Sequence, residues 1–313
     1  MIKNILFFSV FFINCLFAGN KITSAFEFLR TDFNPRTSAM GNAFTTLRGD
    51  VSGLFVNPAG MAYSESRHFS VNYTNYLLDI NGGFAAYSQT FEGIGILSAA
   101  ITYMDYGKIT ATDESANEIG SFTPADFALT IGWADKFEKN ISYGVNLKYA
   151  FSTIQDYNAS AIALDLGMIW EAPFQEDLYI AFALLNVGTE IEYYANTQED
   201  LPLSMRLGFS KKLAHLPLEL AVSLTDINRA ESVLDGFKQF SVGGEFRISE
   251  SLRLRLGYDN RLHKDLKARE ASEFGGVSGG IGIFVKKFRI DYSYSNYNLL
   301  GNTHRFGITG NLD

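Results

Sequence analysis

Cysteine is almost absent from this chain of 313 residues. The single one, Cys15, lies inside an apolar stretch that we predict is removed before the protein matures. A mature chain without cysteine has no disulfide, no thiolate metal ligand and no cysteine nucleophile. In the alternative, Cys15 is the modified residue of a lipoprotein, which Asn14 disfavours because a small residue is expected there.

Basic clusters and long apolar runs are also scarce. No run of five or more basic residues occurs and the net charge is −8, which argues against binding to nucleic acid. A helical membrane span needs about 20 apolar residues in succession, and the only long apolar run is Ile5 to Phe17. Lys3 precedes this run and Ala18 offers a small residue for cleavage, so residues 1–18 are predicted to be a secretory signal peptide.

Alternating strands make up most of the remaining sequence. Strands that cross a membrane need about 9 to 11 residues, whereas strands of soluble proteins average about five or six. Fourteen segments follow one another along the chain, and all but the first have nine residues or more. They are residues 67–73, 81–91, 94–103, 124–137, 141–153, 159–172, 177–187, 201–212, 217–225, 237–248, 251–259, 274–285, 288–297 and 303–312.

Each of the clearest strands has one apolar face and one polar face. Between Phe288 and Ser295 aromatic and aliphatic residues alternate with arginine, aspartate and serine, a period of two. A charge on a lipid-facing surface costs about 2 to 4 kcal/mol near the midplane, so the charged positions are predicted to face the lumen. These lumen-lining charges are His68, Arg206, Glu219, Glu245, Arg247, Arg253, Arg255, Arg289 and Asp291. We expect them to pair with one another or with a plug, the alternative being that they guide a polar solute.

The connections between successive strands alternate between short and long. The longer ones are residues 74–80, 104–123, 154–158, 188–200, 226–236, 260–273 and 298–302. Outer-membrane barrels have short turns in the periplasm and longer loops outside, and tyrosines gather here near strand ends as they do at a membrane interface. The strands of a soluble β-sandwich also alternate between apolar and polar residues. They are shorter, however, and their loops show no regular alternation of short and long. We therefore predict a 14-stranded antiparallel transmembrane β-barrel over residues 66–313, in the bacterial outer membrane.

Residues 19–65 do not alternate and are predicted to form short helices that plug the lumen. Thr37 or Ser38 is a candidate cap for one helix, and Asn57 followed by Pro58 is a favoured start for another. The apolar side chains of this segment need a surface to pack against. The alternative is a periplasmic segment lying under the barrel mouth.

The same segment carries a resemblance to a known family. Its motifs are Phe28-Leu29-Arg30, the run Pro35 to Phe44 and the run Asp50 to Met61, which includes Asn57-Pro58-Ala59-Gly60. In this order they resemble the N-terminal signature of the PorV/PorQ family, which is itself similar to the FadL-type fatty-acid transporters. The resemblance implies a plugged 14-stranded barrel and a role in type IX secretion, as a carrier or an anchor of proteins. Its plug motif corresponds here to Arg36, Met40, Gly41, Asn57, Pro58, Ala59 and Gly60.

These observations favour binding over catalysis. The histidines His68, His215, His263 and His304 lie on separate strands, turns or loops, and none pairs in sequence with a serine and a carboxylate. We predict no enzyme activity, no cofactor and no metal; the acidic residues of loop 104–123 lack the spacing of a calcium loop. The expected partners are outer-membrane lipid and a secretion-machinery or secreted protein, held by loops 104–123, 188–200 and 260–273. The alternatives are a passive transporter of a hydrophobic ligand and a mainly structural barrel.

Overall fold

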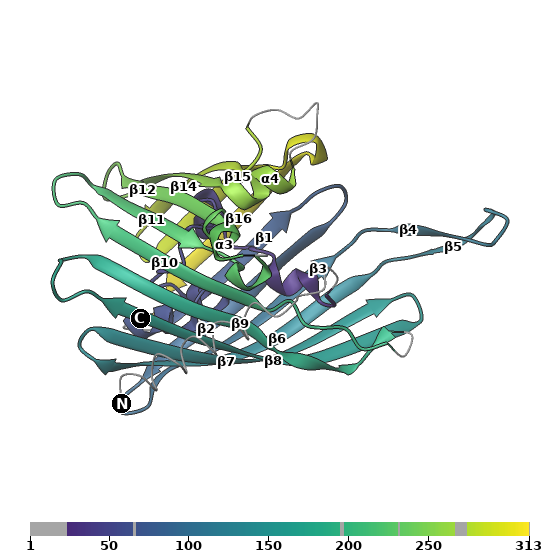
Figure 1. The fold of residues 1–313 in the computed structure, drawn as a ribbon, viewed down its shortest axis with the longest axis horizontal. Coiled ribbons are helices and arrows are strands. Elements are labelled where there is room, and N and C mark those ends of the chain that lie inside the picture. The colour runs from purple at the N-terminus through teal and green to yellow at the C-terminus, as the bar shows by residue number, and fades with distance from the viewer. Residues whose placement is uncertain (1–23, 65–66, 195–196, 231, 267–273, 313) are drawn as a thin grey trace.

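The computed structural model describes residues 24–64, 67–194, 197–230, 232–266 and 274–312. The predicted signal peptide lies outside these residues. Fourteen strands form one closed antiparallel barrel in which β1 pairs with β16, and the predicted fold is therefore confirmed (Figure 1). The barrel strands are β1 (His68–Asn75), β2 (Asn81–Phe91), β3 (Gly95–Asp105), β6 (Ala125–Glu138), β7 (Ile141–Ile154), β8 (Tyr157–Glu171), β9 (Leu178–Glu192), β10 (Ser204–Lys212), β11 (Leu218–Leu224), β12 (Phe240–Arg247), β13 (Leu252–Asp259), β14 (Val277–Val285), β15 (Phe288–Asn296) and β16 (Asn302–Asn311).

The two remaining strands form a separate hairpin, β4 (Ile109–Thr112) with β5 (Glu118–Phe122). The hairpin projects well beyond the end of the barrel (Figure 1). It lies within the segment 104–123, which is predicted as the longest of the outer loops. We call this end of the barrel the outer end and the end with the short turns the inner end, which faces the periplasm.

Several predicted boundaries differ from the structure. The connection predicted at 154–158 is a tight turn, because β7 runs to Ile154 and β8 begins at Tyr157. The connection predicted at 226–236 carries the short helices η5 (Ile227–Arg229) and α3 (Val233–Phe237), the second of which extends one residue beyond it, and α4 (Asn260–Asp265) follows β13. Strands β12 and β14 each begin three residues later than predicted.

The two faces of the barrel wall differ as the alternation predicts. On β13, Leu254 and Leu256 are 41% and 63% exposed, while Arg255 between them is 0% exposed. Exposed large apolar residues cover the outside of the wall in this way on every barrel strand, as lipid contact requires. Among the described residues no helix is long and apolar enough to cross a membrane.

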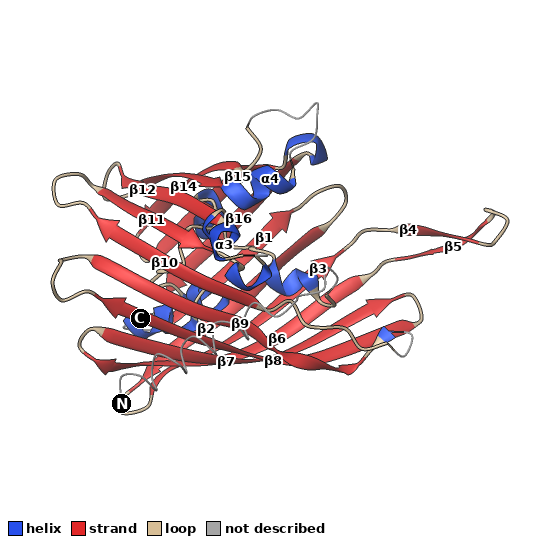
Figure 2. Ribbon diagram, viewed as in Figure 1, coloured by secondary structure: helices blue, strands red, loops and turns tan. Residues whose placement is uncertain are grey.

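The N-terminal segment forms a plug of short helices inside the ring of strands (Figure 2). These are η1 (Glu27–Arg30), α2 (Pro35–Ala39), η2 (Val51–Phe55) and η3 (Pro58–Tyr63). Helix α2 contacts β13 to β16, whereas η3 contacts β6 to β8 on another part of the wall. The plug therefore fills the width of the lumen.

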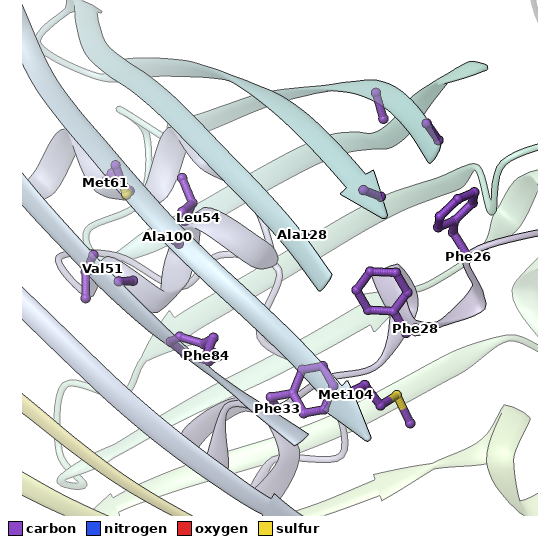
Figure 3. Packing of buried hydrophobic residues seen from close by; sticks show 14 of the residues in the cluster. Phe26, Phe28, Phe33, Val51, Leu54, Met61, Phe84, Ala100, Met104 and Ala128 are labelled. Carbon is purple, nitrogen blue, oxygen red and sulfur yellow. The ribbon is translucent and has the colours of Figure 1, made fainter. Parts of the chain in front are cut away.

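The plug also runs along the length of the lumen. The Ala25 backbone N–H donates to Asp200 O in the outer connection between β9 and β10. From there the chain passes through the barrel and leaves at the inner end, where β1 begins at His68. Apolar side chains of the plug, including Phe28, Phe33 and Leu54, pack against apolar residues of the wall (Figure 3). These wall residues include Phe84 of β2, Ala100 of β3 and Ala128 of β6.

Candidate functional site

Helix α2 is placed by local capping and by contacts with the wall. Its cap is Asn34, whose Oδ1 accepts from the Arg36 backbone N–H at 2.9 Å, with Pro35 in the first turn. The expectation that Thr37 or Ser38 is the cap is therefore wrong. Both residues are already within the helix, and the asparagine before the proline satisfies the free N–H.

Arg36 leads from this helix into a network of ion pairs. Its Nε and Nη2 donate to the two oxygens of Glu245 on β12, at 2.9 and 2.8 Å. Glu245 also accepts from Arg255 Nε at 2.6 Å, and Arg255 Nη1 donates to Asp291 at 2.6 Å. Four charged residues from one plug helix and three strands are therefore joined by direct hydrogen bonds.

Asp50 of the plug joins the network from a second position. Arg289 Nη2 donates to Asp50 Oδ2 at 2.5 Å, and Arg289 Nε donates to Asp291 at 2.6 Å. Asp50 is buried, and burial alone would raise the pKa of its carboxyl, but the charges of Arg289 and Arg36 hold that pKa below its usual range. The carboxylate is therefore ionised at neutral pH and attracts both arginines.

The Asn57-Pro58-Ala59-Gly60 element anchors the other half of the plug. Asn57 is fully buried; its Oδ1 accepts from the Ala59 N–H, and its Nδ2 lies within hydrogen-bond distance of three backbone carbonyls, those of Thr45, Met168 and Phe182. A Cβ at Gly167 would lie 2.1 Å from Asn57 Oδ1, so the wall provides space for this side chain only with glycine. One asparagine thus caps η3 and ties it to β8 and β9.

Met40 and Gly41 lie against the wall on the α2 side. A Cβ at Gly257 of β13 would lie 2.1 Å from the Gly41 backbone nitrogen and from the Met40 carbonyl carbon. Gly41 itself has φ +64°, a conformation that favours glycine. The plug backbone therefore touches the wall directly at this point.

The other predicted lumen charges occupy different surroundings. Glu219 accepts from Arg48 Nη2 at 2.6 Å, and the Arg48 guanidinium lies 3.5 Å from the centre of the Tyr179 ring. Arg206 donates from Nε to Ser204, and it lines a cavity at the outer end. Arg247 and Arg253 lie at the inner end, Arg247 beside Glu250 at 3.4 Å, and His68 is the first residue of β1.

Sequence reasoning missed several buried charges of the lumen. Lys148 Nζ lies 2.8 Å from Asp165 Oδ2 on the next strand, and both side chains are almost completely buried. Arg305 of β16 is 2% exposed and donates from Nε to the Asp32 carbonyl at 2.8 Å. Each of these residues is at an inward-facing position of an alternating strand. The period of two in the sequence was therefore the signal that could have found them.

Two large cavities lie on either side of the plug. The inner one has a volume of about 1220 Å³ and is lined by plug residues such as Arg36, Arg48 and Tyr63, by the β8–β9 and β10–β11 turns, and by the inner ends of β12 to β15. The outer one has a volume of about 670 Å³ and is lined by Arg30, Asp226 and Arg261 among others. Arg30 and Arg261 both contact the Asp226 carboxylate; burial would raise its pKa, but the two charges keep the pKa below its usual range.

A third cavity, beside the plug, is much smaller. This cavity has a volume of about 20 Å³ and lies between the plug and the wall, lined by four phenylalanines and by polar residues that include Asp32 and Lys148. This volume holds about one water molecule and is too small for a hydrocarbon ligand. Among the described residues, no group of three or more histidine, cysteine, aspartate or glutamate side chains is arranged to hold a metal.

Comparisons with solved structures agree with the fold. The toluene transporter TbuX of Ralstonia pickettii has a TM-score of 0.58 at 13% identity, over 90% of this chain and 98% of that chain. A Pseudomonas aeruginosa FadL homologue has a TM-score of 0.56 at 13% identity, over 90% and 98%. The toluene transporter TodX of Pseudomonas putida has a TM-score of 0.58 at 11% identity, over 87% and 95%. At these identities the likeness shows the fold alone.

Sequence comparison identifies the family. No curated protein matches the chain. The family model described as Type IX secretion system protein PorV matches residues 17–215, which is more than half of the sequence and includes the whole plug and the wall as far as the β10–β11 turn. The chain therefore belongs to the PorV family and is an outer-membrane β-barrel of type IX secretion.

Proposed function

We propose that this barrel holds a protein partner at its outer end, and that the β4–β5 hairpin is the main contact. The hairpin is a two-stranded sheet, so its outer edges have no neighbouring strand among the described residues. Such a hairpin is marginally stable by itself. A free strand edge can add a strand from another chain, which stabilises both.

The side chains of the hairpin support this role. Ile109 is 43% exposed and Ile119 is 66% exposed, and both stand beyond the membrane-spanning part of the wall. Apolar residues exposed to water on a projecting hairpin favour contact with another protein. The partner would be a secreted protein or another component of the secretion machinery.

The interior of the barrel favours binding over transport. Ion pairs tie Arg36 and Asp50 of the plug to the wall, and the cavity lined by Phe28, Phe33, Phe55 and Phe84 beside the plug holds about 20 Å³. A passage for a hydrophobic molecule would need a continuous apolar path. The transporter reading therefore has less support than partner binding, although FadL-like barrels share the fold. Catalysis has no support in the arrangement of the described histidines: His304 bonds with Tyr292 on the outer face.

Copurification tests the proposal. A variant with Ile109→Lys and Ile119→Lys is expected to lose most of the protein that copurifies with the wild-type barrel from envelopes of the native host. The matched control carries Thr110→Lys and Ser121→Lys, which add the same charge to the same hairpin at positions that pair with each other. Equal partner recovery by both variants, or uptake of long-chain fatty acid by a wild-type barrel that recovers no partner, would contradict the proposal.

A further inference from the structure

The inner end of the barrel has a strongly uneven distribution of charge. Three neighbouring hairpins, β10–β11, β12–β13 and β14–β15, carry six basic residues at and beside their turns, apart from Arg289, which pairs with Asp50. The acidic residues at the same positions are Glu250 and Glu219, and Glu219 pairs with Arg48. The basic residues, which we call the basic arc, are Lys211, Lys212, Arg247, Arg253, Lys286 and Lys287. The chain as a whole has a net charge of −8, so the arc opposes the overall sign.

The turns on the other side of the inner end have the opposite charge. Glu92, Glu138, Glu176 and Asp177 lie in or beside the β2–β3, β6–β7 and β8–β9 turns, with Lys136 and Lys139 as the basic residues among them. A positive arc facing a negative one across one mouth produces a field that can orient a charged partner.

The cations of the arc have few carboxylate partners. Among the described residues, Arg253 forms no ion pair, and its Nη1 donates only to backbone carbonyls of the β12–β13 turn, at 2.5 to 3.3 Å. Its guanidinium lies 4.7 Å from the centre of the Phe284 ring. Lys211 donates to the carbonyl of Glu176, and the pair of Arg247 with Glu250 is largely exposed, so it is weak.

Arg253 is therefore held in place while part of its guanidinium stays available. The carbonyls and the aromatic ring fix its position, and the Nε and Nη2 atoms make no hydrogen bond to described residues. Arg253, Lys211, Lys212 and Arg247 all line the inner cavity. A guanidinium positioned in this way is suited to a carboxylate.

The size of the cavity limits what can occupy it. Its volume of about 1220 Å³ exceeds the range of about 300 to 1000 Å³ that is usual for small-molecule sites. It is bounded by turns that face the periplasm, and its deeper charges, Arg36 and Arg48, are already paired with Glu245 and Glu219. The available cations are thus those near the entrance, where a chain can pass.

We propose that the basic arc and the inner cavity bind an acidic polypeptide segment of a periplasmic protein. The segment would lie across Lys211, Lys212 and Arg253 with its carboxylates on these cations. This site is separate from the outer hairpin, so the barrel would contact proteins on both sides of the membrane.

A binding measurement with defined probes tests the inference. Fluorescein-labelled deca-glutamate is added to the full barrel in an uncharged detergent, with deca-lysine as the probe of opposite charge, and anisotropy is measured. Wild type is expected to bind deca-glutamate and to lose affinity steeply as ionic strength rises. The triple variant Lys211→Gln, Lys212→Gln, Arg253→Gln is expected to bind it at least tenfold more weakly.

The control removes the same number of charges elsewhere. Lys108→Gln, Lys139→Gln and Lys264→Gln lie outside the arc and are expected to leave affinity within twofold of wild type. If the triple variant loses its folded gel mobility, Lys212→Glu with Lys286→Glu, both at exposed positions, tests the same arc. The triple variant is expected to copurify with the outer partner as wild type does. This result would show that loss of deca-glutamate binding is independent of partner binding at the β4–β5 hairpin.

Equal binding of deca-glutamate by wild type and by the triple variant would overturn the inference. So would retention of anionic phospholipid by wild type but not by the triple variant, in the absence of deca-glutamate binding. That result would assign the arc to lipid headgroups.

Discussion

The Arg289 guanidinium of β15 donates to the Asp50 carboxylate of the plug at 2.5 Å, across 239 residues of sequence. The same carboxylate lies 3.4 Å from Arg36 Nη1, and Arg289 continues to Asp291 on its own strand. Asp50 therefore forms ion pairs both with the plug, through Arg36, and with the barrel wall, through Arg289. Removal of the Asp50 carboxylate would leave the buried positive charges of Arg36 and Arg289 with one fewer negative charge to neutralise them.

We expect Asp50→Asn to loosen the plug by about 3 kcal/mol, because breaking a buried ion pair leaves its partner uncompensated. Limited trypsin digestion of the purified barrel checks this, since Arg36 and Arg48 become cleavable when the plug opens. Asp156→Asn, in the exposed β7–β8 turn, is the matched control. Identical digestion of the two variants would show that Asp50 does not secure the plug.

The same carboxylate predicts how the plug responds to acid. The pKa of Asp50 is held below its ordinary value, so the stability that it contributes is present above about pH 4 and is lost as pH falls further. Plug protection should therefore stay constant from pH 7 to about pH 4 and decline below it, measured with pepsin in the acid range. Asp50→Asn should lack the part of the decline that Asp50 causes. An unaltered acid profile in that variant would assign the decline to other groups.

Gly257→Ala is expected to displace the plug from the α2 side of the wall. The added Cβ would lie 2.1 Å from backbone atoms of Met40 and Gly41, which cannot move as a flexible side chain can. Overpacking of this kind costs about 1 to 3 kcal/mol. Gly279→Ala is the control, because its Cβ would meet its nearest atom at 3.4 Å. The temperature at which heat-modifiable gel mobility is lost should fall for Gly257→Ala alone.

Asn57→Ala removes one helix cap and the hydrogen bonds from Nδ2 to wall and plug carbonyls. A lost cap costs about 1 kcal/mol, and the loss of the buried hydrogen bonds from Nδ2 adds to this. We expect faster proteolysis within the plug than in Asn117→Ala, a change at the exposed end of the outer hairpin. Comparable proteolysis rates for both would argue against Asn57 as an anchor.

Leu254→Arg places a charge on the lipid-facing side of β13, which costs about 2 to 4 kcal/mol near the midplane. We expect less folded barrel in the membrane fraction and a lower proportion of the heat-modifiable band. Leu299→Arg, in the exposed β15–β16 connection, should insert normally. Normal insertion of Leu254→Arg would contradict the placement of Leu254 against lipid.

The barrel could be predicted because lipid imposes a strict period of two. Leu254 and Arg255 must face opposite sides of a wall that meets hydrocarbon on one side. The apolar or charged nature of each residue is enough to predict which side it faces. The hairpin β4–β5 lies outside the membrane, where no such constraint acts. Its few short alternations therefore could not be distinguished from an irregular loop.

The pairing of the lumen charges was less accessible to sequence reasoning. Parity places Glu245 and Arg289 on the inner wall, but it does not reveal that Arg36 and Asp50 reach them from the plug. Those contacts depend on how the plug crosses the lumen. Lys148 and Arg305 are at inward-facing positions of their strands, but each is the only charge on that face and lies among small residues, so its strand shows a weaker polar pattern.

The path of the plug also constrains biogenesis. The chain lies beside Asp200 at one mouth and departs for β1 at the other, with the backbone of Met40 and Gly41 touching the wall between them. Where the plug touches the wall this closely, a closed barrel leaves little room for a segment to be threaded through it afterwards. The β1–β16 seam is therefore expected to seal last, around an occupant already in position, so a folding factor that acts at this seam would govern both closure and occupancy.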